Sequence, residues 1–233
     1  SRDLWDWCAI RDCRLIYASS AATYGDGELG FEDKDDLESL SALRPLNAYG
    51  YSKFLFDQYA LRQAERSQAP TQWTGLKFFN VYGPNEGHKG TMKSVVAQIW
   101  PKVAADQPVT LFRSHRPDYA DGGQMRDFVF VDDVVDIIVW LLETPSVSGI
   151  YNAGSGQARS FADLARATFA AAGKEPRIDY VDTPEVIRDK YQYFTEARMD
   201  RIRAAGFDGQ STPLEEGIRR YVQDYLATSD PYR

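Results

Sequence analysis

Apolar and polar residues follow two different periods along the chain, and each period predicts one kind of element. Short apolar runs with β-branched or aromatic residues, typical of buried strands, lie at 14–20, 74–82, 109–112, 126–131 and 149–153. Helical spacing of apolar residues is found at 3–9, 48–66, 91–105, 132–143, 160–172, 198–205 and 213–227. Because strands alternate with helices, the pattern predicts an α/β protein with a parallel sheet covered on both faces.

Local signals refine the ends of these elements. Asn47 is expected to cap the helix that follows it, and Asp132 or Asp133 to cap the helix after strand 126–131. Pro101 is expected to kink or break the helix in which it lies, because proline lacks the backbone N–H. The Gly-rich, acidic segment 25–45 is predicted to be a loop, and the polar segment 113–124 a loop or flap.

Composition narrows the classes of function. The chain has 233 residues, of which 43% are hydrophobic, and its net charge of -7 gives no general support for binding a nucleic-acid backbone. The longest apolar run is too short to cross a bilayer and the first residues show no secretory signal, so we expect no membrane span and a cytoplasmic protein. Two cysteines and two histidines do not predict a metal site.

Residues 25–30, GDGELG, match the spacing of the glycine-rich dinucleotide fingerprint. That fingerprint works by exposing backbone amides to a pyrophosphate at the start of a helix. Here the glycines do not directly follow the strand, and a strongly acidic stretch comes after them. We therefore interpret the triplet as ordinary turn chemistry.

The pair Tyr49 and Lys53 lies one helical turn apart, so the two side chains share a face. A phenol titrates near 10 and is a poor base at neutral pH, but an ammonium about 4.5 Å away favours a phenolate by roughly 3 to 4 kcal/mol at an effective dielectric of about 20. An isolated pair of this spacing is more often an exposed lysine beside a half-buried tyrosine. Upstream hydroxyls at Ser19, Ser20 and Thr23 can orient a substrate alcohol; the alternative for Ser20 and Thr23 is that they only satisfy loop backbone groups.

The order of several motifs adds a resemblance to these observations. The succession SSAATYG, YGYSK, FFNVYGP and RDFVFVDDV resembles the extended short-chain dehydrogenase/reductase superfamily, also called the NAD-dependent epimerase/dehydratase superfamily. The longer stretches PLNAYGYSKFLFD, FNVYGPNEGHKGTM and YQYFT resemble its ADP-L-glycero-D-manno-heptose 6-epimerase family, over essentially all residues. The resemblance implies a Rossmann-type doubly wound parallel sheet with a smaller mixed α/β substrate domain.

The resemblance implies that the protein epimerises ADP-heptose at C6 by transient oxidation of the substrate. The oxidant would be bound NADP, with NAD as the alternative. The product would serve lipopolysaccharide synthesis. Tyr49 and Lys89 would serve the two epimers as acid/base groups, and Ser20 would hydrogen-bond the reacting oxygen. Lys53 would activate Tyr49 and hold the nicotinamide ribose. Tyr49, Lys89 and Val81 would also contact the cofactor. By itself, Lys89 between two glycines is more often a surface lysine.

The substrate carries a diphosphate, so the protein must supply local positive charge. Arg126 is the best candidate clamp because a guanidinium binds two phosphate oxygens at once, although it can equally pair with Asp127. The resemblance adds substrate contacts at Ser20, Asn80, Thr91, Gln98, Phe112, Arg113, Ser114, His115 and Tyr191. Gln98 stands where a histidine is expected and Thr91 where a serine is expected, and the loop from His115 to Arg126 is longer than expected.

The domain arrangement follows from the same resemblance. Residues 1–82 and 126–155 are expected to form the remaining part of the dinucleotide-binding domain, and 83–125 and 156–233 the substrate-binding domain. The family's N-terminal glycine-rich region is absent from this sequence, which we interpret as a fragment. The family also predicts a homo-oligomer, a pentamer. Two alternatives stay open: another nucleotide-sugar epimerase or 4,6-dehydratase, and an inactive binding or scaffold protein.

Overall fold

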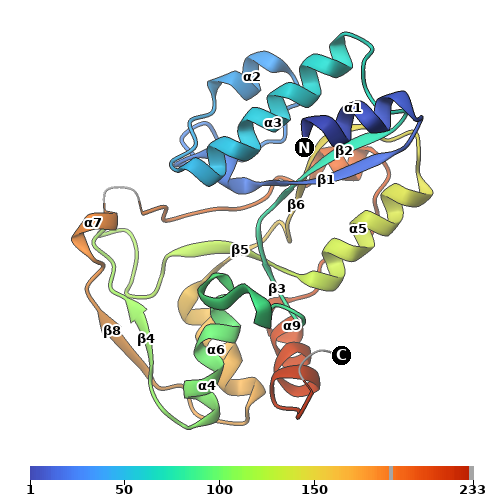
Figure 1. The fold of residues 1–233 in the computed structure, drawn as a ribbon. Helices are drawn as coiled ribbons and strands as arrows, with labels where there is room; N and C mark the ends of the chain where they lie inside the picture. The colour runs from blue at the N-terminus through green and yellow to red at the C-terminus, as the bar shows by residue number, and fades with distance from the viewer. Residues whose placement is uncertain (189–190, 231–233) are drawn as a thin grey trace. The chain divides into compact units, whose positions relative to one another are not determined.

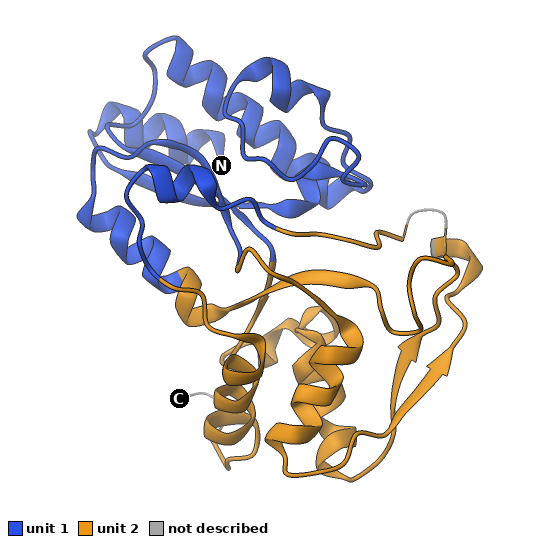
Figure 2. Cartoon of the chain, turned by 180° about the vertical axis from the view of Figure 1, so that it is seen from behind, with its two compact units in different colours: residues 1–79, 135–154, 197–209 blue, residues 80–134, 155–196, 210–233 orange. Residues whose placement is uncertain are grey.

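The computed structural model describes residues 1–188 and 191–230, and its chain divides into two compact units (Figure 2). Unit 1 consists of 1–79, 135–154 and 197–209; unit 2 consists of 80–134, 155–196 and 210–233. Parallel strand pairs in each unit confirm the α/β class. Within the described residues, no helix is both long and apolar enough to span a membrane.

Unit 1 is built on a three-stranded parallel sheet in the order β1-β2-β6 (Figure 1). The strands are β1 (Leu15–Ser20), β2 (Trp73–Phe78) and β6 (Gly149–Ala153). In register, Ser20 pairs with Phe78, and Phe78 pairs with Ala153. The three strands therefore end together, and their carboxyl ends form the edge at which α/β proteins bind ligands.

Helices cover both faces of this sheet, as the apolar pattern predicts. The helices of unit 1 are α1 (Arg2–Ile10), α2 (Leu37–Ala42), α3 (Ala48–Glu65), most of α5 (Val131–Glu143) and α8 (Asp200–Ala204). Trp5, Phe54 and Trp73 belong to one buried cluster, in which α1 and α3 pack on the sheet. Leu76 and Ile137 belong to a second cluster, in which α5 packs on it. Alternate strand residues thus point to opposite faces.

Unit 2 has one large apolar core shared by helices and two small sheets. Its strands are β3 (Asn80–Tyr82), β4 (Val109–Phe112), β5 (Met125–Phe130), β7 (Ala158–Ser160) and β8 (Ile178–Val181). Its helices are α4 (Val95–Ala104), α6 (Phe161–Ala171), α7 (Glu185–Arg188) and α9 (Leu214–Tyr221), which continues as a π-turn, Val222–Leu226. β3 and β5 are parallel, whereas β7 runs antiparallel to β5.

Three local expectations are wrong. The predicted loop 25–45 contains α2, whose N-cap Asp36 accepts a hydrogen bond from the Ser39 amide at 2.7 Å. α4 continues through Pro101 instead of breaking, because its buried residues, such as Ile99 and Val103, fasten both sides of the proline to the core. Asp132 and Asp133 lie inside the first turn of α5, which starts at Val131, so neither precedes the helix as a cap.

Candidate active site

The N-terminal turn of α3 carries Tyr49 and Lys53. Asn47 caps this helix as predicted, since its side chain accepts a hydrogen bond from the Gly50 amide at 2.8 Å. The Lys53 Nζ lies 5.7 Å from the centroid of the Tyr49 ring and donates a hydrogen bond to the Ala18 carbonyl of β1 at 2.9 Å. Tyr49 is 57% exposed. The structure therefore holds the ammonium beside an accessible phenol, next to the strand that ends at Ser20.

A glycine lets this helical turn approach the turn after β1. A Cβ placed on Gly50 would lie 2.7 Å from the carbonyl oxygen of Ala22, in the short 3-10 turn Ala21–Tyr24. Ser20 caps that turn, because its hydroxyl accepts a hydrogen bond from the Ala22 amide at 3.1 Å. Since a hydroxyl also carries a donor, Ser20 can satisfy the backbone and still hydrogen-bond a substrate oxygen.

Ser19 and Thr23, the other two hydroxyls of this segment, belong to a buried network. The Ser19 hydroxyl donates to the Asp57 carboxylate at 2.7 Å. Lys77 donates to Asp57 at 2.7 Å and to the Thr23 hydroxyl at 2.6 Å, and Thr23 donates to the Ser20 carbonyl at 2.8 Å. Thr23 thus hydrogen-bonds a loop carbonyl, as its alternative interpretation expects, whereas Ser19 bonds a side chain of α3. The network ties α3, β1 and β2 together beneath the candidate catalytic groups.

The same Asp57 also perturbs a tyrosine of β1. The Tyr17 hydroxyl donates to Asp57 at 3.0 Å, and burial followed by the Asp57 charge raises the pKa of Tyr17 well above its ordinary value. Tyr17 thus stays a neutral donor in the physiological range. Sequence reasoning missed Asp57 and Lys77, because a contact between residues 20 positions apart on different elements leaves no local pattern.

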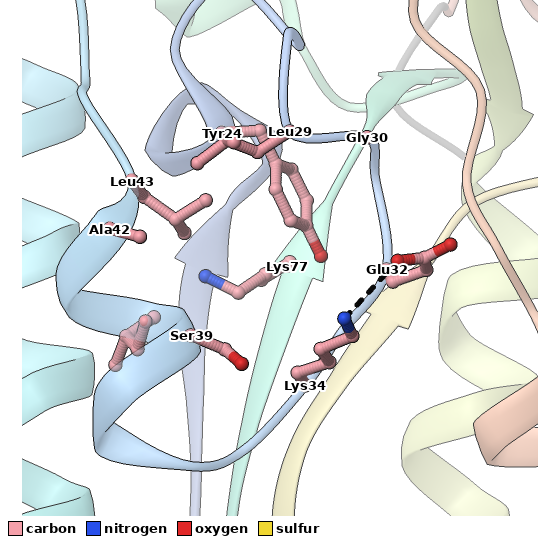
Figure 3. Close-up of a pocket in the computed structure, with 10 residues that line it drawn as sticks. Tyr24, Leu29, Gly30, Glu32, Lys34, Ser39, Ala42, Leu43 and Lys77 are labelled. Carbon is pink, nitrogen blue, oxygen red and sulfur yellow. Dashed lines mark ion pairs between the residues drawn. The ribbon is translucent and has the colours of Figure 1, made fainter.

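A cavity of about 200 Å³ in unit 1 lies next to this network (Figure 3). Tyr24, Ser39, Leu43 and Lys77 are among its lining residues, and the close-up shows the ion pair of Lys34 and Glu32 at its edge. None of the predicted catalytic residues lines it. The Lys77 ammonium already meets Asp57 and Thr23, so we assign this cavity no part in the reaction.

The glycine triplet 25–30 is a series of turns, as predicted. Gly25, Gly27 and Gly30 all have positive φ, between 71° and 85°, and they follow the 3-10 turn rather than joining a strand to a helix. A pyrophosphate cradle is therefore not formed there. Among the described residues, Tyr49 and Lys53 fit a nicotinamide cofactor, because a phenol and an ammonium beside the carboxyl end of a parallel sheet can meet ribose hydroxyls.

In unit 2, three predicted substrate contacts lie around one cavity of about 290 Å³. Gln98, Phe112 and Tyr191 line it, together with apolar residues that include Ile99 and Phe161. The rings of Phe112 and Tyr191 meet edge to face, 5.9 Å apart. Burial raises the pKa of Tyr191, and the Arg126 charge partly offsets this rise. A largely apolar, aromatic lining of this kind suits a planar base.

Arg126 lies at the start of β5 with aromatic rings around it. Its guanidinium carbon is 5.6 Å from the ring centroids of both Phe161 and Tyr191, and its Nη1 donates to the Met125 carbonyl at 2.8 Å. Burial lowers the pKa of Arg126 from its ordinary value. Over the described ranges 1–188 and 191–230, no ion pair of Arg126 is found; Asp127 instead accepts hydrogen bonds from Ser155. The geometry thus favours an anion clamp over a pair with Asp127.

The segment after β4 is fixed by Tyr193, which sequence reasoning did not single out. The buried Tyr193 hydroxyl accepts hydrogen bonds from the His115 amide at 2.9 Å and from the Ser114 hydroxyl at 3.3 Å. Arg113 is occupied by acidic neighbours, 3.3 Å from Asp182 and 3.9 Å from Asp121. Tyr193 is the second tyrosine of the motif YQYFT, and its place in this motif is the sequence signal that indicates it.

The remaining predicted residues lie on β3 and on the following loop. Asn80 is exposed on β3 beside the half-buried Val81. Lys89 and Thr91 are exposed on the 3-10 segment Gly87–Met92. Gln98 donates from α4 to the Lys93 carbonyl at 2.7 Å, which ties the end of this loop to the helix.

Comparisons with known proteins identify the class. The family model for the NAD dependent epimerase/dehydratase family matches residues 1–154. The chain therefore belongs to the NAD dependent epimerase/dehydratase family, whose enzymes use a nicotinamide cofactor.

Within this family, the chain is 51% identical to an ADP-L-glycero-D-manno-heptose-6-epimerase of Nitratidesulfovibrio vulgaris strain DP4, with 100% of this chain and 70% of the relative covered. It is 48% identical to the enzyme of that name from Fusobacterium nucleatum, over 98% of this chain and 70% of the relative. The Helicobacter pylori enzyme of that name superposes with a TM-score of 0.70 at 27% identity, over 93% of this chain and 61% of that one.

A second solved structure shows the breadth of the family. The Thermus thermophilus UDP-glucose 4-epimerase in complex with NAD superposes with a TM-score of 0.72 at 28% identity, over 95% of this chain and 67% of that one. These similarities confirm the predicted Rossmann-type fold and the resemblance that the motifs indicated.

Proposed function

We propose that this chain catalyses epimerisation at C6 of ADP-D-glycero-D-manno-heptose, which yields the L-glycero epimer for lipopolysaccharide synthesis. The observation that carries the proposal is the Tyr49–Lys53 pair at the end of β1, in a chain that is 51% identical over its whole length to an ADP-heptose 6-epimerase. The enzyme is an isomerase.

The chemistry explains why proton-handling groups are needed on both faces of the reacting carbon. The hydrogen at an alcohol carbon is not acidic, so the stereocentre inverts through oxidation to a ketone and reduction from the other face; the nicotinamide, when bound, accepts the hydride and returns it. Tyr49 handles the hydroxyl proton of one epimer and Lys89 that of the other. Ser20 hydrogen-bonds the reacting oxygen. Lys53 places its positive charge beside Tyr49 and holds the nicotinamide ribose.

The nucleotide end of the substrate is recognised in unit 2. Arg126 binds the diphosphate, since its guanidinium lies beside the aromatic cavity and meets no carboxylate in the described part of the chain. Phe112 and Tyr191 contact the base, and Arg113, Ser114 and His115 form the neighbouring rim. The sugar contacts Asn80, Thr91 and Gln98, while Val81 contacts the cofactor.

The finer parts of the proposal concern cofactor and assembly. We take NADP as the cofactor, with NAD as the alternative, and a homo-oligomer, a pentamer, as the assembly. The division into a dinucleotide-binding domain at 1–82 and 126–155 and a substrate-binding domain at 83–125 and 156–233 stays a prediction. We take the cytoplasm as the location of the reaction.

One experiment tests the function directly. The intact protein is incubated with ADP-D-glycero-D-manno-heptose, and NMR follows the signals of the C6 proton, while mass spectrometry identifies any nicotinamide cofactor that copurifies. We expect conversion to a mixture of both C6 epimers and a bound NADP. Inversion at C4, or loss of water, would instead show another nucleotide-sugar epimerase or dehydratase. Absence of both turnover and cofactor would favour a binding protein.

A further inference from the structure

The loop that carries Lys89, residues 87–92, is exposed, and the residues that attach it to the core lie at its two ends. Residues 87–92 are all exposed, and Met92 at the far end is 83% exposed. The side chain of Lys89 makes no hydrogen bond or ion pair with any residue that the structure describes. Its position is therefore set by the backbone, whose nearest fixed point is the hydrogen bond from the Lys89 amide to the Glu86 carbonyl at 3.0 Å.

Glu86 is the buried residue at that fixed point. It is 4% exposed, and its carboxylate accepts hydrogen bonds from the Ser94 amide at 2.6 Å and from the Ser94 hydroxyl. One side chain thus joins both ends of the loop, from residue 86 to residue 94. Ser94 is also the N-cap of α4, so the loop's exit is fixed to a helix of the unit 2 core.

A third bond attaches Glu86 to another helix. The Tyr221 hydroxyl of α9 donates to the Glu86 carboxylate at 2.9 Å, and burial together with the Glu86 charge raises the pKa of Tyr221 well above its ordinary value. Tyr221 therefore remains a donor. Both α4 and α9 contribute to the same apolar core, so Glu86 is held by two elements that the core makes rigid.

We propose that Glu86, held by Ser94 and Tyr221, is a positioning residue that fixes the Lys89 loop for proton transfer to one of the two epimers. This role rests on the proposed function of Lys89. Glu86 itself is buried and fully engaged by its three bonds, so it acts through the loop and not on the substrate. Displacement of a reacting group by about 1 Å can reduce a rate about 100-fold, so loosening this anchor should be visible in the kinetics.

The test compares Glu86→Gln and Tyr221→Phe with wild type, with Lys89→Ala as the reference for loss of the lysine. Glu216→Gln is the matched control, because Glu216 is a carboxylate of α9 that pairs only with Arg219 and Arg220 on the described surface of unit 2. Each variant is mixed with either C6 epimer in a single turnover, and the absorbance of reduced nicotinamide is followed. Hydrogen exchange of peptides covering 87–93 gives a second readout that needs no activity.

We expect Glu86→Gln to slow the epimer that Lys89→Ala slows, by about 10- to 100-fold, and to leave the other within about twofold. Exchange in 87–93 should become faster, and Tyr221→Phe should give the same pattern more weakly, since it keeps both Ser94 bonds. Faster exchange with no selective slowing, or equal slowing of both epimers, would overturn the positioning role. If Glu86→Gln does not fold, the same two measurements on Tyr221→Phe, the oxidation rates of both epimers and the exchange in 87–93, test the positioning role.

The failure of the proposed function gives a different result. A wild-type protein that acts on neither epimer contradicts the function before any variant is compared. Lys89→Ala with both half-reactions intact contradicts the acid/base role of Lys89, and the positioning role falls with it. If Lys89→Ala slows the oxidation of one epimer only, while Glu86→Gln and Tyr221→Phe oxidise both epimers at the wild-type rate, the positioning role of Glu86 alone is contradicted.

Discussion

Gly50 lets the first turn of α3, which carries Tyr49, lie close to the turn after β1. A methyl group there would meet the Ala22 carbonyl oxygen at 2.7 Å and the Pro45 Cβ at 3.0 Å, both of which are held by neighbouring structure. The first turn of α3 would have to move away from the turn after Ser20. The helix conformation of Gly50 itself accepts alanine, so any effect comes from this close approach and not from backbone strain.

Gly50→Ala should therefore lower the free energy of unfolding by about 1 to 3 kcal/mol, as overpacking commonly does. It should also lower kcat, because the phenol is displaced from the substrate. Urea unfolding and steady-state kinetics measure the two effects. Glu65→Ala, an exposed change at the other end of α3, should leave both unchanged. Wild-type kinetics in Gly50→Ala would show that this contact does not place Tyr49.

At the scale of residues, sequence predicts what is local and misses what is distant. Tyr49 and Lys53 share a face because helical spacing alone brings them together, and Asn47 caps the helix by a local hydrogen bond. Glu86 and Tyr221 are 135 positions apart, so no local sequence pattern predicts their hydrogen bond. The roles of the predicted site residues remain proposals.

Among the elements, α3 is joined to the sheet by the buried pair of Asp57 and Lys77. Both side chains are almost fully buried, at 0% and 1% exposure; Ser19 and Tyr17 also donate to Asp57, and Thr23 accepts a hydrogen bond from Lys77. A buried pair of this kind costs desolvation energy when it forms, but removal of one partner leaves the other charge without compensation.

Asp57→Asn should accordingly lower the free energy of unfolding by about 3 to 5 kcal/mol, measured by urea unfolding. The double variant Asp57→Leu with Lys77→Met removes both charges and should recover much of that loss. Its kcat should stay low, because Ser19 at the end of β1 and Thr23 in the following 3-10 turn lose their partners Asp57 and Lys77. Equal stability of Asp57→Asn and wild type would contradict the assignment of this pair as the tie between α3 and the sheet.

The elements also show where periodicity succeeds. The strands and long helices of unit 1 were predicted within a few residues, because their apolar faces repeat over several turns or alternate along a strand. The short helix α2 was missed, since six residues within an acidic, Gly-rich stretch give no repeat. The helix does not break at Pro101, because the local preference against proline is outweighed by the burial of the apolar face of α4.

For the whole molecule, net charge and substrate charge have the same sign. The chain carries -7, and a nucleotide diphosphate sugar is also an anion. At physiological salt the Debye length is about 8 Å, so distant acidic residues are largely screened, and the proposed role of Arg126 depends on the guanidinium near the phosphate and not on the net charge. The acidic composition therefore gives no general support for binding a nucleic-acid backbone, whereas a single diphosphate needs only a local cation.

The sequence predicted the α/β class of the whole chain, because strands alternate with helices, but it did not predict how the strands divide among sheets. The continuous apolar run at 74–82 contributes β2 to one sheet and β3 to another, with Phe79 between them. β7 pairs antiparallel with β5 through residues that carry no alternation. Which strands share a sheet depends on long-range packing, and the periodicity of apolar residues along the chain does not contain that information.

We propose that Tyr49 and Lys89 serve different epimers as acid/base groups. It is tested by single-turnover kinetics of Tyr49→Phe and Lys89→Ala, each mixed with ADP-D-glycero- and ADP-L-glycero-D-manno-heptose, with reduced nicotinamide as the signal. We expect a crossed result, in which each variant loses oxidation of one epimer by about 100-fold or more and keeps that of the other. Loss of both epimers in Tyr49→Phe together with wild-type rates in Lys89→Ala would contradict it.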